Sequence, residues 1–251
     1  MSSALRVPVD QLRVGSFELN EATSRYVARV HRRAVGDLLE LFEPTQGTKA
    51  IARITSIDQG HVLVDVTEVQ RSSARGAREI VIVQCLAKGE KMDSIVRDAT
   101  ELGATRFVPA ESERSIVRLV KQADRAAERS QRWRRISVEA SRQCGRDEAL
   151  SVDEPATLVD VLTSLEADLK LILLPTGETL LRELLPRAEA LASIAFVVGP
   201  EGGLSHEEAT LAIEHGWVST RLGPLTLRTE TVAAAVLGTL MVCLASETSE
   251  R

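Results

Sequence analysis

Three short loops hold residue types that could bind a ligand and act on it. They read LLPTG at 173–177, GPEGGLS at 199–205 and LGPLTLRTE at 222–230. The second loop has three glycines in five positions, so a ligand can approach its backbone without obstruction by a Cβ atom. Glu201 is a carboxylate that could accept a proton, and Arg228 is a cation that could stabilise developing negative charge. These two residues are the candidate catalytic pair.

Each loop directly follows a predicted strand, so we expect the three loops to lie close together at one edge of a sheet. The strands read LKLILLP at 169–175, SIAFVVG at 193–199 and WVSTRLG at 217–223. Helices are predicted near 178–192, 206–215 and 230–246, and Ser205 with Glu208 predicts a capping box at one helix start. Strands that alternate with helices predict a parallel sheet covered on both faces, and ligands bind at the carboxyl ends of its strands.

A simpler interpretation exists for each loop taken alone. The glycine-rich loop would be a tight strand-to-helix turn with an exposed, idle Glu201, and Arg228 would pair with Glu230 or Glu201 at a helix start. Convergence of three loops at one edge of the sheet favours a binding site over these alternatives, because that edge is where a parallel sheet binds its ligands.

The first part of the chain has a different pattern. Strand-like segments separated by turn residues are predicted near the N-terminus (LRVPV) and at 38–42, 49–57 and 61–69, with one short helix over 21–33. These elements predict a small β-barrel-like domain over residues 1–72, followed by a polar linker around 70–78. An α/β domain over 73–251 would begin with strands at 79–87 and 106–109 and helices at 91–102 and 123–143.

The composition is that of a globular protein and excludes several classes. Of 251 residues, 44% are hydrophobic and 27% are charged, which rules out a disordered, collagen-like or coiled-coil chain. No apolar run approaches the roughly 18–20 residues that cross a bilayer, and the N-terminus lacks the pattern of a signal sequence. Three cysteines without close spacing favour a reducing compartment, so we expect a cytoplasmic protein without a membrane anchor.

Charge is unevenly distributed along the chain. The net charge of −5 argues against a general nucleic-acid binder. Residues 114–146, however, hold 10 basic and 3 acidic residues, and nearly all the basic ones are arginines, which suit bidentate phosphate binding. This stretch is a candidate RNA-binding surface or, alternatively, a solvated helix face balanced by acidic residues elsewhere. A smaller cluster comprises Arg25, Arg29, Arg32 and Arg33.

Several familiar signatures are missing from the sequence. Neither G-x-x-x-x-G-K-[ST] nor a G-x-G-x-x-G following a strand occurs, which argues against P-loop and Rossmann dinucleotide enzymes. H-E-x-x-H, C-x-x-C and G-x-S-x-G are also absent, so neither a metal site nor a hydrolase elbow is expected.

Five segments in register resemble one enzyme family. They are GPEGGLSHEE at 199–208, LGPLTLRTET at 222–231, KMDSIVRDATELGATRFVPAESERS at 91–115, RWRRISVEASRQCGR at 132–146 and RYVARVHRRAVGDLLELF at 25–42. Together they make essentially the whole chain similar to the ribosomal RNA small subunit methyltransferase E family. Its members are knotted SPOUT-class enzymes that methylate the N3 nitrogen of one uridine in small-subunit (16S) ribosomal RNA.

The resemblance implies a fold, a cofactor and partners. It implies a PUA-like β-barrel over residues 1–72 and a SPOUT α/β domain with a parallel sheet and a C-terminal trefoil knot over 73–251. The cofactor implied is S-adenosyl-L-methionine, with no metal required. The expected partners are a second copy of the chain in a homodimer and small-subunit ribosomal RNA, within an assembled or nearly assembled subunit.

The resemblance also assigns roles to particular residues. Glu201 and Arg228 would face the reacting centre. The cofactor pocket would be lined by Leu174, Pro175, Gly199, Pro200, Gly202, Gly203, Leu222, Gly223, Leu227 and Thr229. Arginines expected at the RNA are Arg25, Arg29, Arg32, Arg114, Arg132 and Arg135.

The chain departs from the family pattern at four places, none of them a glycine of the loops. It has Ser24-Arg25-Tyr26-Val27 in place of a His-rich stretch, Asp98 in place of Lys, Arg142 in place of Glu, and Leu225-Thr226 in place of Arg-Ile. Two alternatives to the family function stay open. One is a SPOUT methyltransferase that acts on another RNA position or on transfer RNA, and the other is a non-catalytic RNA-binding protein.

Overall fold

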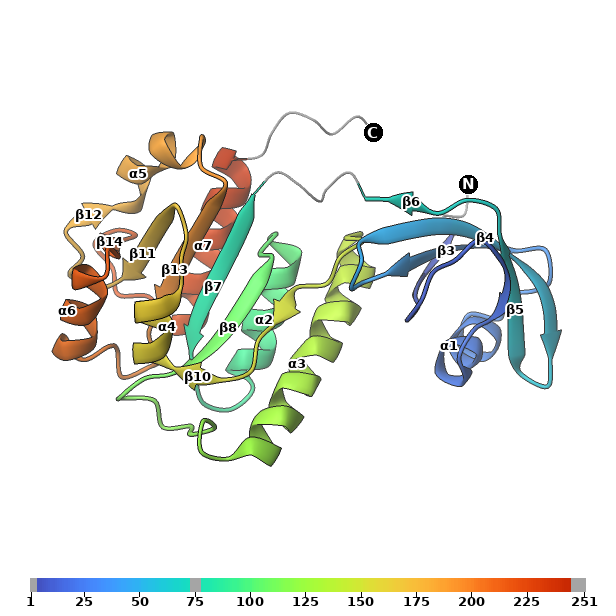
Figure 1. The fold of residues 1–251 in the computed structure, drawn as a ribbon, viewed down its shortest axis with the longest axis horizontal. Coiled ribbons are helices and arrows are strands. Elements are labelled where there is room, and N and C mark those ends of the chain that lie inside the picture. The colour runs from blue at the N-terminus through green and yellow to red at the C-terminus, as the bar shows by residue number, and fades with distance from the viewer. Residues whose placement is uncertain (1–3, 73–77, 245–251) are drawn as a thin grey trace. The chain divides into compact units, whose positions relative to one another are not determined.

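The chain divides into two compact units (Figure 1). The computed structural model describes residues 4–72 and 78–244. One unit comprises Met1–Gly76 with Val138–Ala149, and the other comprises Ala77–Ser137 with Leu150–Arg251. The last turns of the long helix α3 (Ala123–Cys144) therefore belong to the first unit by their contacts.

The first unit is a six-stranded, mainly antiparallel sheet with order β1-β3-β4-β5-β2, in which β6 pairs with β4. Its strands are β1 (Leu5–Pro8), β2 (Gly15–Glu18), β3 (Leu38–Glu43), β4 (Thr48–Asp58), β5 (His61–Val66) and β6 (Gln70–Arg71). Residues on β4 alternate between a buried face at Ala50, Ala52 and Ile54 and an outer face, as the period of a half-buried strand requires. The strands predicted at 38–42, 49–57 and 61–69 are thus β3, β4 and β5.

The helix predicted over 21–33 is shorter than expected. Asn20 caps α1 (Glu21–Arg25) by accepting a hydrogen bond from the Thr23 N–H, and a wider π-helical turn, Tyr26–Val30, follows. Arg32 then adopts a left-handed backbone with φ of 50°. The chain therefore leaves the helix before residue 33, and the basic residues of this segment lie on a short helix and the turns after it.

Ion pairs join residues 138–149 to the strands of the first unit. Asp147 lies 2.7 Å from Arg6 and 3.1 Å from Lys49, and its side chain is only 5% exposed. Burial raises the pKa of Asp147, but hydrogen bonds from Arg6, Ser72 and Lys49 outweigh it, so the pKa lies below its ordinary value. Asp147 is therefore ionised and shared between two cations.

The second unit is built on an eight-stranded sheet with order β10-β8-β7-β13-β11-β14-β12, in which β9 pairs with β8. All its strand pairs are parallel, as predicted. The strands are β7 (Glu79–Cys85), β8 (Arg106–Glu111), β9 (Ser151–Val152), β10 (Ala156–Thr157), β11 (Leu169–Leu173), β12 (Thr179–Leu180), β13 (Ser193–Val198) and β14 (Val218–Arg221). The helices besides α3 are α2 (Lys91–Glu101), α4 (Leu158–Ser164), α5 (Leu181–Ala188), α6 (His206–Glu214) and α7 (Thr229–Leu244).

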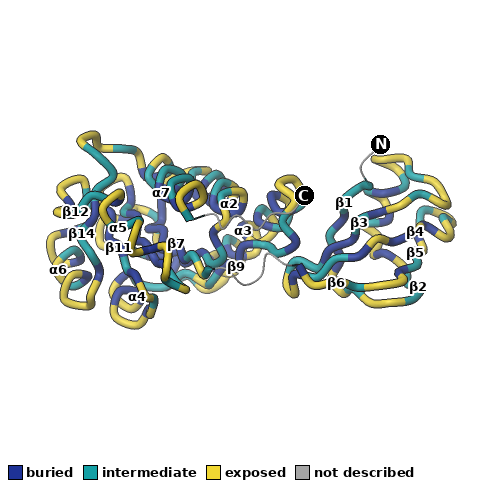
Figure 2. Tube along the Cα trace, turned by 90° about the horizontal axis from the view of Figure 1, so that it is seen from above, coloured by how far each residue is buried: buried dark blue, intermediate teal, exposed yellow. Residues whose placement is uncertain are grey.

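Helices cover both faces of this sheet. Alternate residues of β13 belong to two separate apolar cores: Phe196 packs in the core that includes residues of α2, α5 and α7, and Val197 packs in the core that includes residues of α4 and α6. In Figure 2 the exposed residues lie mainly on the outer turns and helix surfaces. Among the described residues, no helix is both long and apolar enough to span a bilayer.

Two segments of the second unit cross at backbone distance. The Leu174 N–H donates to the Thr220 carbonyl at 2.9 Å, and Arg221 donates to the Gly177 carbonyl. A Cβ atom added to Gly177 would lie 2.4 Å from the carbonyl carbon of Thr220, so only glycine fits there. The first predicted loop is therefore locked to β14, the strand that leads into the third loop.

We expect Asp147→Ala to destabilise the first unit by about 1–3 kcal/mol at pH 7, because it removes a buried partner of Arg6 and Lys49. Since the pKa of Asp147 is lower in the folded unit than in the unfolded chain, this contribution is complete above about pH 5 and is lost as the pH falls through the lowered pKa. Hydrogen exchange of the β3 and β4 amides measures it. The exposed Asp58 provides the control, and equal effects of Asp58→Ala and Asp147→Ala would contradict the prediction.

Candidate active site

A cavity of about 540 Å³ opens at the carboxyl ends of β11 and β13. A smaller cavity of about 50 Å³ adjoins it and shares Leu173–Pro175 and Leu227 with it. Eight of the ten residues that the resemblance assigns to the cofactor line the large cavity: Leu174, Pro175, Gly199, Pro200, Gly202, Gly203, Leu227 and Thr229. The other two, Leu222 and Gly223, line the small one. Glu201 and Arg228 both line the large cavity.

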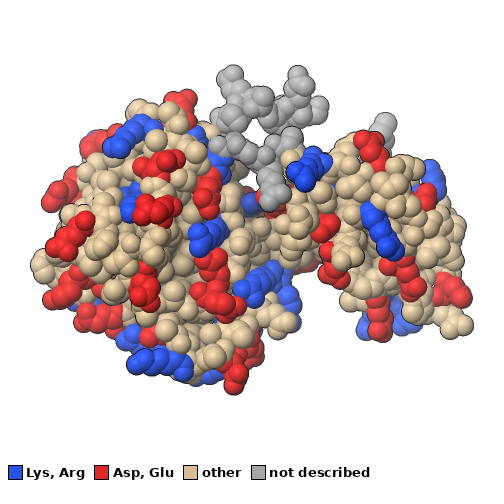
Figure 3. All heavy atoms as spheres, in the orientation of Figure 1, with Lys and Arg blue, Asp and Glu red and all other residues tan. Residues whose placement is uncertain are grey.

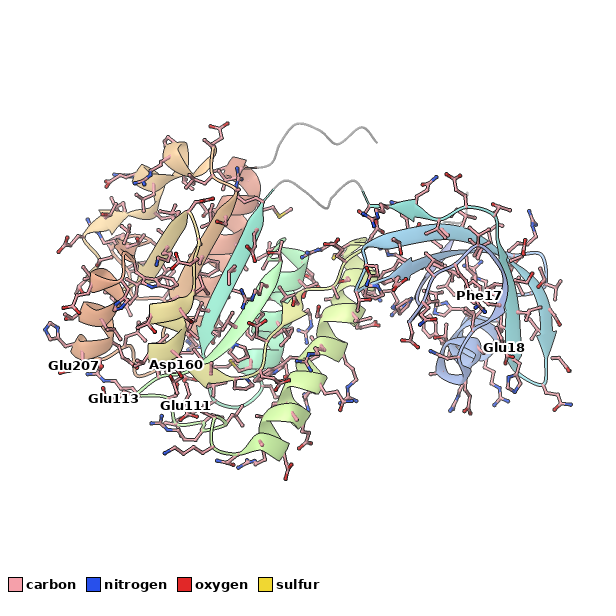
Figure 4. All side chains as sticks on the ribbon, in the orientation of Figure 1. Phe17, Glu18, Glu111, Glu113, Asp160 and Glu207 are labelled. Carbon is pink, nitrogen blue, oxygen red and sulfur yellow. The ribbon has the colours of Figure 1, made fainter. Side chains whose placement is uncertain are left out.

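The glycine-rich loop has a fixed shape. Gly203 adopts a left-handed backbone with φ of +69° and donates its N–H to the Pro200 carbonyl at 2.9 Å. Ser205 then caps α6 by the predicted capping box, in which its hydroxyl accepts from the Glu208 N–H. Glu208 Oε2 accepts from the Ser205 N–H at 2.9 Å and Oε1 accepts from the Glu113 N–H at 2.7 Å, so the loop after β8 is tied to the start of α6. Figure 4 labels Glu113 in this loop and Glu111 at the end of β8.

Thr229 joins the end of β13 to the start of α7. Its Oγ1 donates to the Gly199 carbonyl at 2.7 Å and accepts from Gln84 Nε2 at 2.9 Å. Gln84 is a fully buried residue of β7, the neighbour of β13 in the sheet. One hydroxyl therefore connects the central strands to the helix that follows the third loop.

Glu201 is held by an ion pair that the sequence did not predict. Its Oε1 lies 3.0 Å from Lys91 Nζ and accepts from the Lys88 N–H at 3.1 Å. Burial raises the pKa of Glu201, but hydrogen bonds from its own backbone, from Lys91 and from Lys88 outweigh it, so the pKa lies below its ordinary value. The hydrogen bond to Glu201 in turn raises the pKa of Lys91. Both groups are charged at neutral pH.

Arg228 is exposed and lines the cavity without the partners that a purely structural role would give it. Within the part of the chain that the structure describes, Glu201 and Glu230 form their ion pairs with Lys91, and Arg228 pairs with neither. The guanidinium of Arg228 is therefore available to a ligand in the cavity.

The arginines predicted to bind RNA have three different environments. Arg25, Arg29 and Arg32 are exposed in the first unit. Arg114 reaches the glycine-rich loop and donates to the Gly202 carbonyl at 3.3 Å. The remaining two lie on α3, where Figure 3 shows basic side chains gathered.

The two arginines of α3 differ in what they contact. Arg132 forms an ion pair with the buried Asp93, which also accepts from Trp133 Nε1 at 3.1 Å. Arg135 is exposed and contacts only the carbonyl of Gln131, one turn earlier on the helix, among its described hydrogen bonds. Arg132 thus has an acidic partner in the second unit, whereas the guanidinium of Arg135 is exposed to solvent.

Sequence reasoning missed Lys91 because it follows a fourth strand end. The segment after β7, residues 86–90, leads directly into α2, and Lys91 is the first residue of that helix. Its position at a strand-to-helix junction was the available signal, since β7 is parallel to β13 and its carboxyl end faces the same edge. Among the described residues, no three His, Cys, Asp or Glu side chains are arranged to hold a metal ion.

Comparison with known proteins identifies the class of protein to which this parallel sheet and its cavity belong. The RNA methyltransferase domain family matches residues 75–241, so the second unit belongs to that class. More particularly, the chain is a member of the ribosomal RNA small subunit methyltransferase E family. A family member from Aquifex aeolicus is 30% identical over 78% of this chain and 82% of its own, and one from Mycobacterium tuberculosis is 30% identical over 86% and 82%.

Solved structures agree with this membership. The ribosomal RNA small subunit methyltransferase E from Neisseria gonorrhoeae, bound to S-adenosyl methionine, has a TM-score of 0.85 and 27% identity over 95% of this chain and 97% of its own. A protein from Legionella pneumophila, in complex with bound cofactor SAM, has the same TM-score and 29% identity over the same shares of the two chains. The likeness therefore extends over both units.

We expect Thr229→Val to destabilise the second unit by about 1–3 kcal/mol, because the change leaves the Gly199 carbonyl and the Gln84 amide without their common partner. Urea unfolding followed by tryptophan fluorescence measures it, since Trp133 and Trp217 are both buried in this unit. Thr239→Val is the matched control on the same helix, where the hydroxyl donates only to the Ala235 carbonyl one turn back. Equal losses in the two variants would contradict the proposed junction.

Proposed function

We propose that this protein is an S-adenosyl-L-methionine-dependent methyltransferase that modifies the N3 nitrogen of a uridine in small-subunit (16S) ribosomal RNA. The observation that carries the proposal is the composition of the cavity. Loops from three separate strand ends bring the ten cofactor candidates and the two catalytic candidates to two adjoining cavities. The chain belongs to the ribosomal RNA small subunit methyltransferase E family, and two similar solved structures contain the cofactor.

The residues present fit the cofactor. A volume of about 540 Å³ lies within the range of about 300–1,000 Å³ that small-molecule sites occupy. A Cβ atom on Gly199 would come 3.1 Å from Leu204 Cγ, so a side chain here would press on Leu204, another residue of the cavity wall. Leu174 and Leu227 supply apolar walls, and backbone groups of the glycine-rich loop supply polar contacts. When bound, the cofactor supplies an electrophilic methyl group whose bond to sulfur breaks with the electron pair remaining on sulfur.

Glu201 and Arg228 provide the chemistry that uracil N3 needs. This nitrogen carries a proton in the neutral base and is a poor nucleophile until that proton leaves. The ionised Glu201 accepts a hydrogen bond from N3–H, orients the base, and passes the departing proton to solvent as the nitrogen lone pair forms the new N–C bond. Arg228 stabilises the negative charge that develops on a uracil oxygen. The low pKa of Glu201 makes it a weak base, so orientation is the larger part of its role.

The RNA side of the proposal uses both units. N3 lies on the Watson–Crick edge, so the target uridine must be unpaired or drawn out of its stack. We propose a PUA-like barrel over residues 1–72 that holds RNA and a SPOUT domain with a trefoil knot over 73–251; the backbone crossing at Gly177 and Thr220 supports the knot. The proposed protein is a cytoplasmic homodimer that acts on an assembled or nearly assembled small subunit.

We expect 3-methyluridine to appear when the purified protein and S-adenosylmethionine are incubated with small ribosomal subunits that lack the modification. Nucleoside mass spectrometry identifies the product. A different methylated nucleoside would reassign the position or the type of the reaction. Cofactor binding without any methylated nucleoside would reject the substrate, and absence of cofactor binding would favour a non-catalytic RNA-binding protein.

Glu201→Gln keeps the shape of the side chain but removes its charge. We expect it to lower turnover about 100-fold while the affinity for S-adenosylmethionine changes little, because Glu201 acts on the base and not on the cofactor. Single-turnover rates and calorimetric titration measure the two effects. Full turnover in this variant would remove Glu201 from the mechanism.

Arg135→Ala and Arg132→Ala should have different effects. Loss of the exposed Arg135 makes the binding constant for RNA less dependent on salt. The slope of its logarithm against log salt concentration becomes less steep by about 0.7–0.9 for each phosphate contact removed, and the free energy of unfolding is unchanged. Loss of Arg132 leaves the buried Asp93 without its ion-pair partner and lowers the free energy of unfolding. RNA binding at several salt concentrations and urea unfolding of both variants measure these outcomes. The assignment is wrong if Arg132→Ala alone changes the salt slope.

A further inference from the structure

Lys91 reaches the cavity from α2, a helix outside the three predicted loops. Its ammonium lies 3.0 Å from Glu201 Oε1 and 3.5 Å from Glu230 Oε2. About a third of the side chain is exposed, 34% for Lys91 and 33% for Glu201, so the pair lies at the wall of the cavity and not in the core. Lys91 therefore bridges the glycine-rich loop and the start of α7.

The direction of the Glu201 carboxylate depends on this bridge. Lys91 and the Lys88 N–H both contact the same oxygen, Oε1, so they fix the orientation of the carboxylate from the side of α2. The Lys88 contact comes from the backbone and carries no full charge. Of these two contacts to Glu201 Oε1, only that of Lys91 therefore brings a full positive charge.

The other charged groups around Glu201 do not replace Lys91. The Arg114 guanidinium is directed to the Gly202 carbonyl, and Glu230 is itself a carboxylate that repels Glu201. Removal of the ammonium would leave two neighbouring carboxylates without their shared cation, and repulsion would then favour the protonated form of one of them. Of the other charged residues, Lys88 contacts Glu201 only through its backbone N–H, Arg114 contacts the adjacent Gly202, and Arg228 lines the same cavity.

We propose that Lys91 is a positioning residue for the methyl transfer, which by bridging Glu201 and Glu230 keeps the Glu201 carboxylate ionised and directed into the cavity. The catalytic consequence rests on the proposed function, because it assumes that Glu201 receives the N3–H of a uracil. The electrostatic part concerns only the side chains of this chain and can be measured without substrate or cofactor.

The electrostatic part is tested with Lys91→Met and Lys91→Arg in protein carrying ¹³C-labelled glutamate. The side-chain carboxyl signal of Glu201 is identified by its loss in Glu201→Gln. We expect Lys91→Met to raise the titration midpoint of Glu201 by about one pH unit or more, whereas Lys91→Arg leaves the midpoint near that of the unchanged protein. The matched control is Lys170→Met, because Lys170 lies on β11 against the Trp217 ring and the Leu165 carbonyl, away from any carboxylate bridge. An unchanged midpoint in Lys91→Met overturns the inference.

The catalytic part is tested by the kinetics of the same variants. We expect Lys91→Met to lower kcat about tenfold or more at neutral pH, with a smaller change in the KM for S-adenosylmethionine, because a misdirected carboxylate affects the base and not the cofactor. The acid limb of the kcat profile should move upward together with the Glu201 midpoint, and Lys91→Arg should recover most of the activity.

The outcomes separate this inference from the proposed function. A loss of kcat that is independent of pH and is not recovered by Lys91→Arg indicates a merely structural lysine and overturns the inference. If the unchanged protein produces no methylated nucleoside while the Glu201 midpoint still depends on Lys91, the proposed function fails, the catalytic role falls with it, and the electrostatic bridge stands.

Discussion

The hydrogen bond from Thr229 Oγ1 to the Gly199 carbonyl is the contact on which the cavity depends. Gly199 directly follows β13, and Thr229 begins α7, so this bond sets the distance between the second and third loops. The side-chain amide of Gln84 on β7 donates a hydrogen bond to the Thr229 hydroxyl and so fixes its orientation. Gln84 and Thr229 are buried and Gly199 is half-buried, so loss of the Thr229 hydroxyl leaves polar groups unsatisfied.

The hydrogen bonds of Thr229 also hold in place the loops that carry the charged side chains of the cavity. Two carboxylates, Glu201 and Glu230, face one ammonium, that of Lys91, and Arg228 stays exposed beside them. A partly exposed ion pair contributes little to folding stability, commonly about 0–1 kcal/mol. The arrangement is therefore better explained by the protonation state and direction it imposes on Glu201 than by any gain in stability. A carboxylate held in this way is prepared to accept a hydrogen bond before the ligand arrives.

Much of the second unit was predictable because its pattern is strong and local. Long apolar runs such as 193–199 and the glycines that follow them determine both a strand and the loop after it, and the parallel sheet was confirmed. Two-residue strands such as β9 and β12 exist only through pairing with distant strands, so no local pattern indicates them. Lys91 was missed for a similar reason: its role comes from Glu201, which is 110 positions later in the sequence. The sequence also did not reveal that Arg132, a predicted RNA contact, forms an ion pair with Asp93.

Two of the positions at which the sequence was expected to depart from the family pattern are in contact in the first unit. Tyr26 stands in the segment that lacks the usual histidines, and Arg142 stands where the family has a glutamate. The Arg142 guanidinium lies 4.8 Å from the centre of the Tyr26 ring and donates to its hydroxyl. Burial lowers the pKa of Arg142, and Glu139, one turn earlier on α3, supplies the compensating charge. A changed residue on the π-helical turn and a changed residue on α3 thus form one cation–π contact, which keeps the last turns of α3 attached to the first unit.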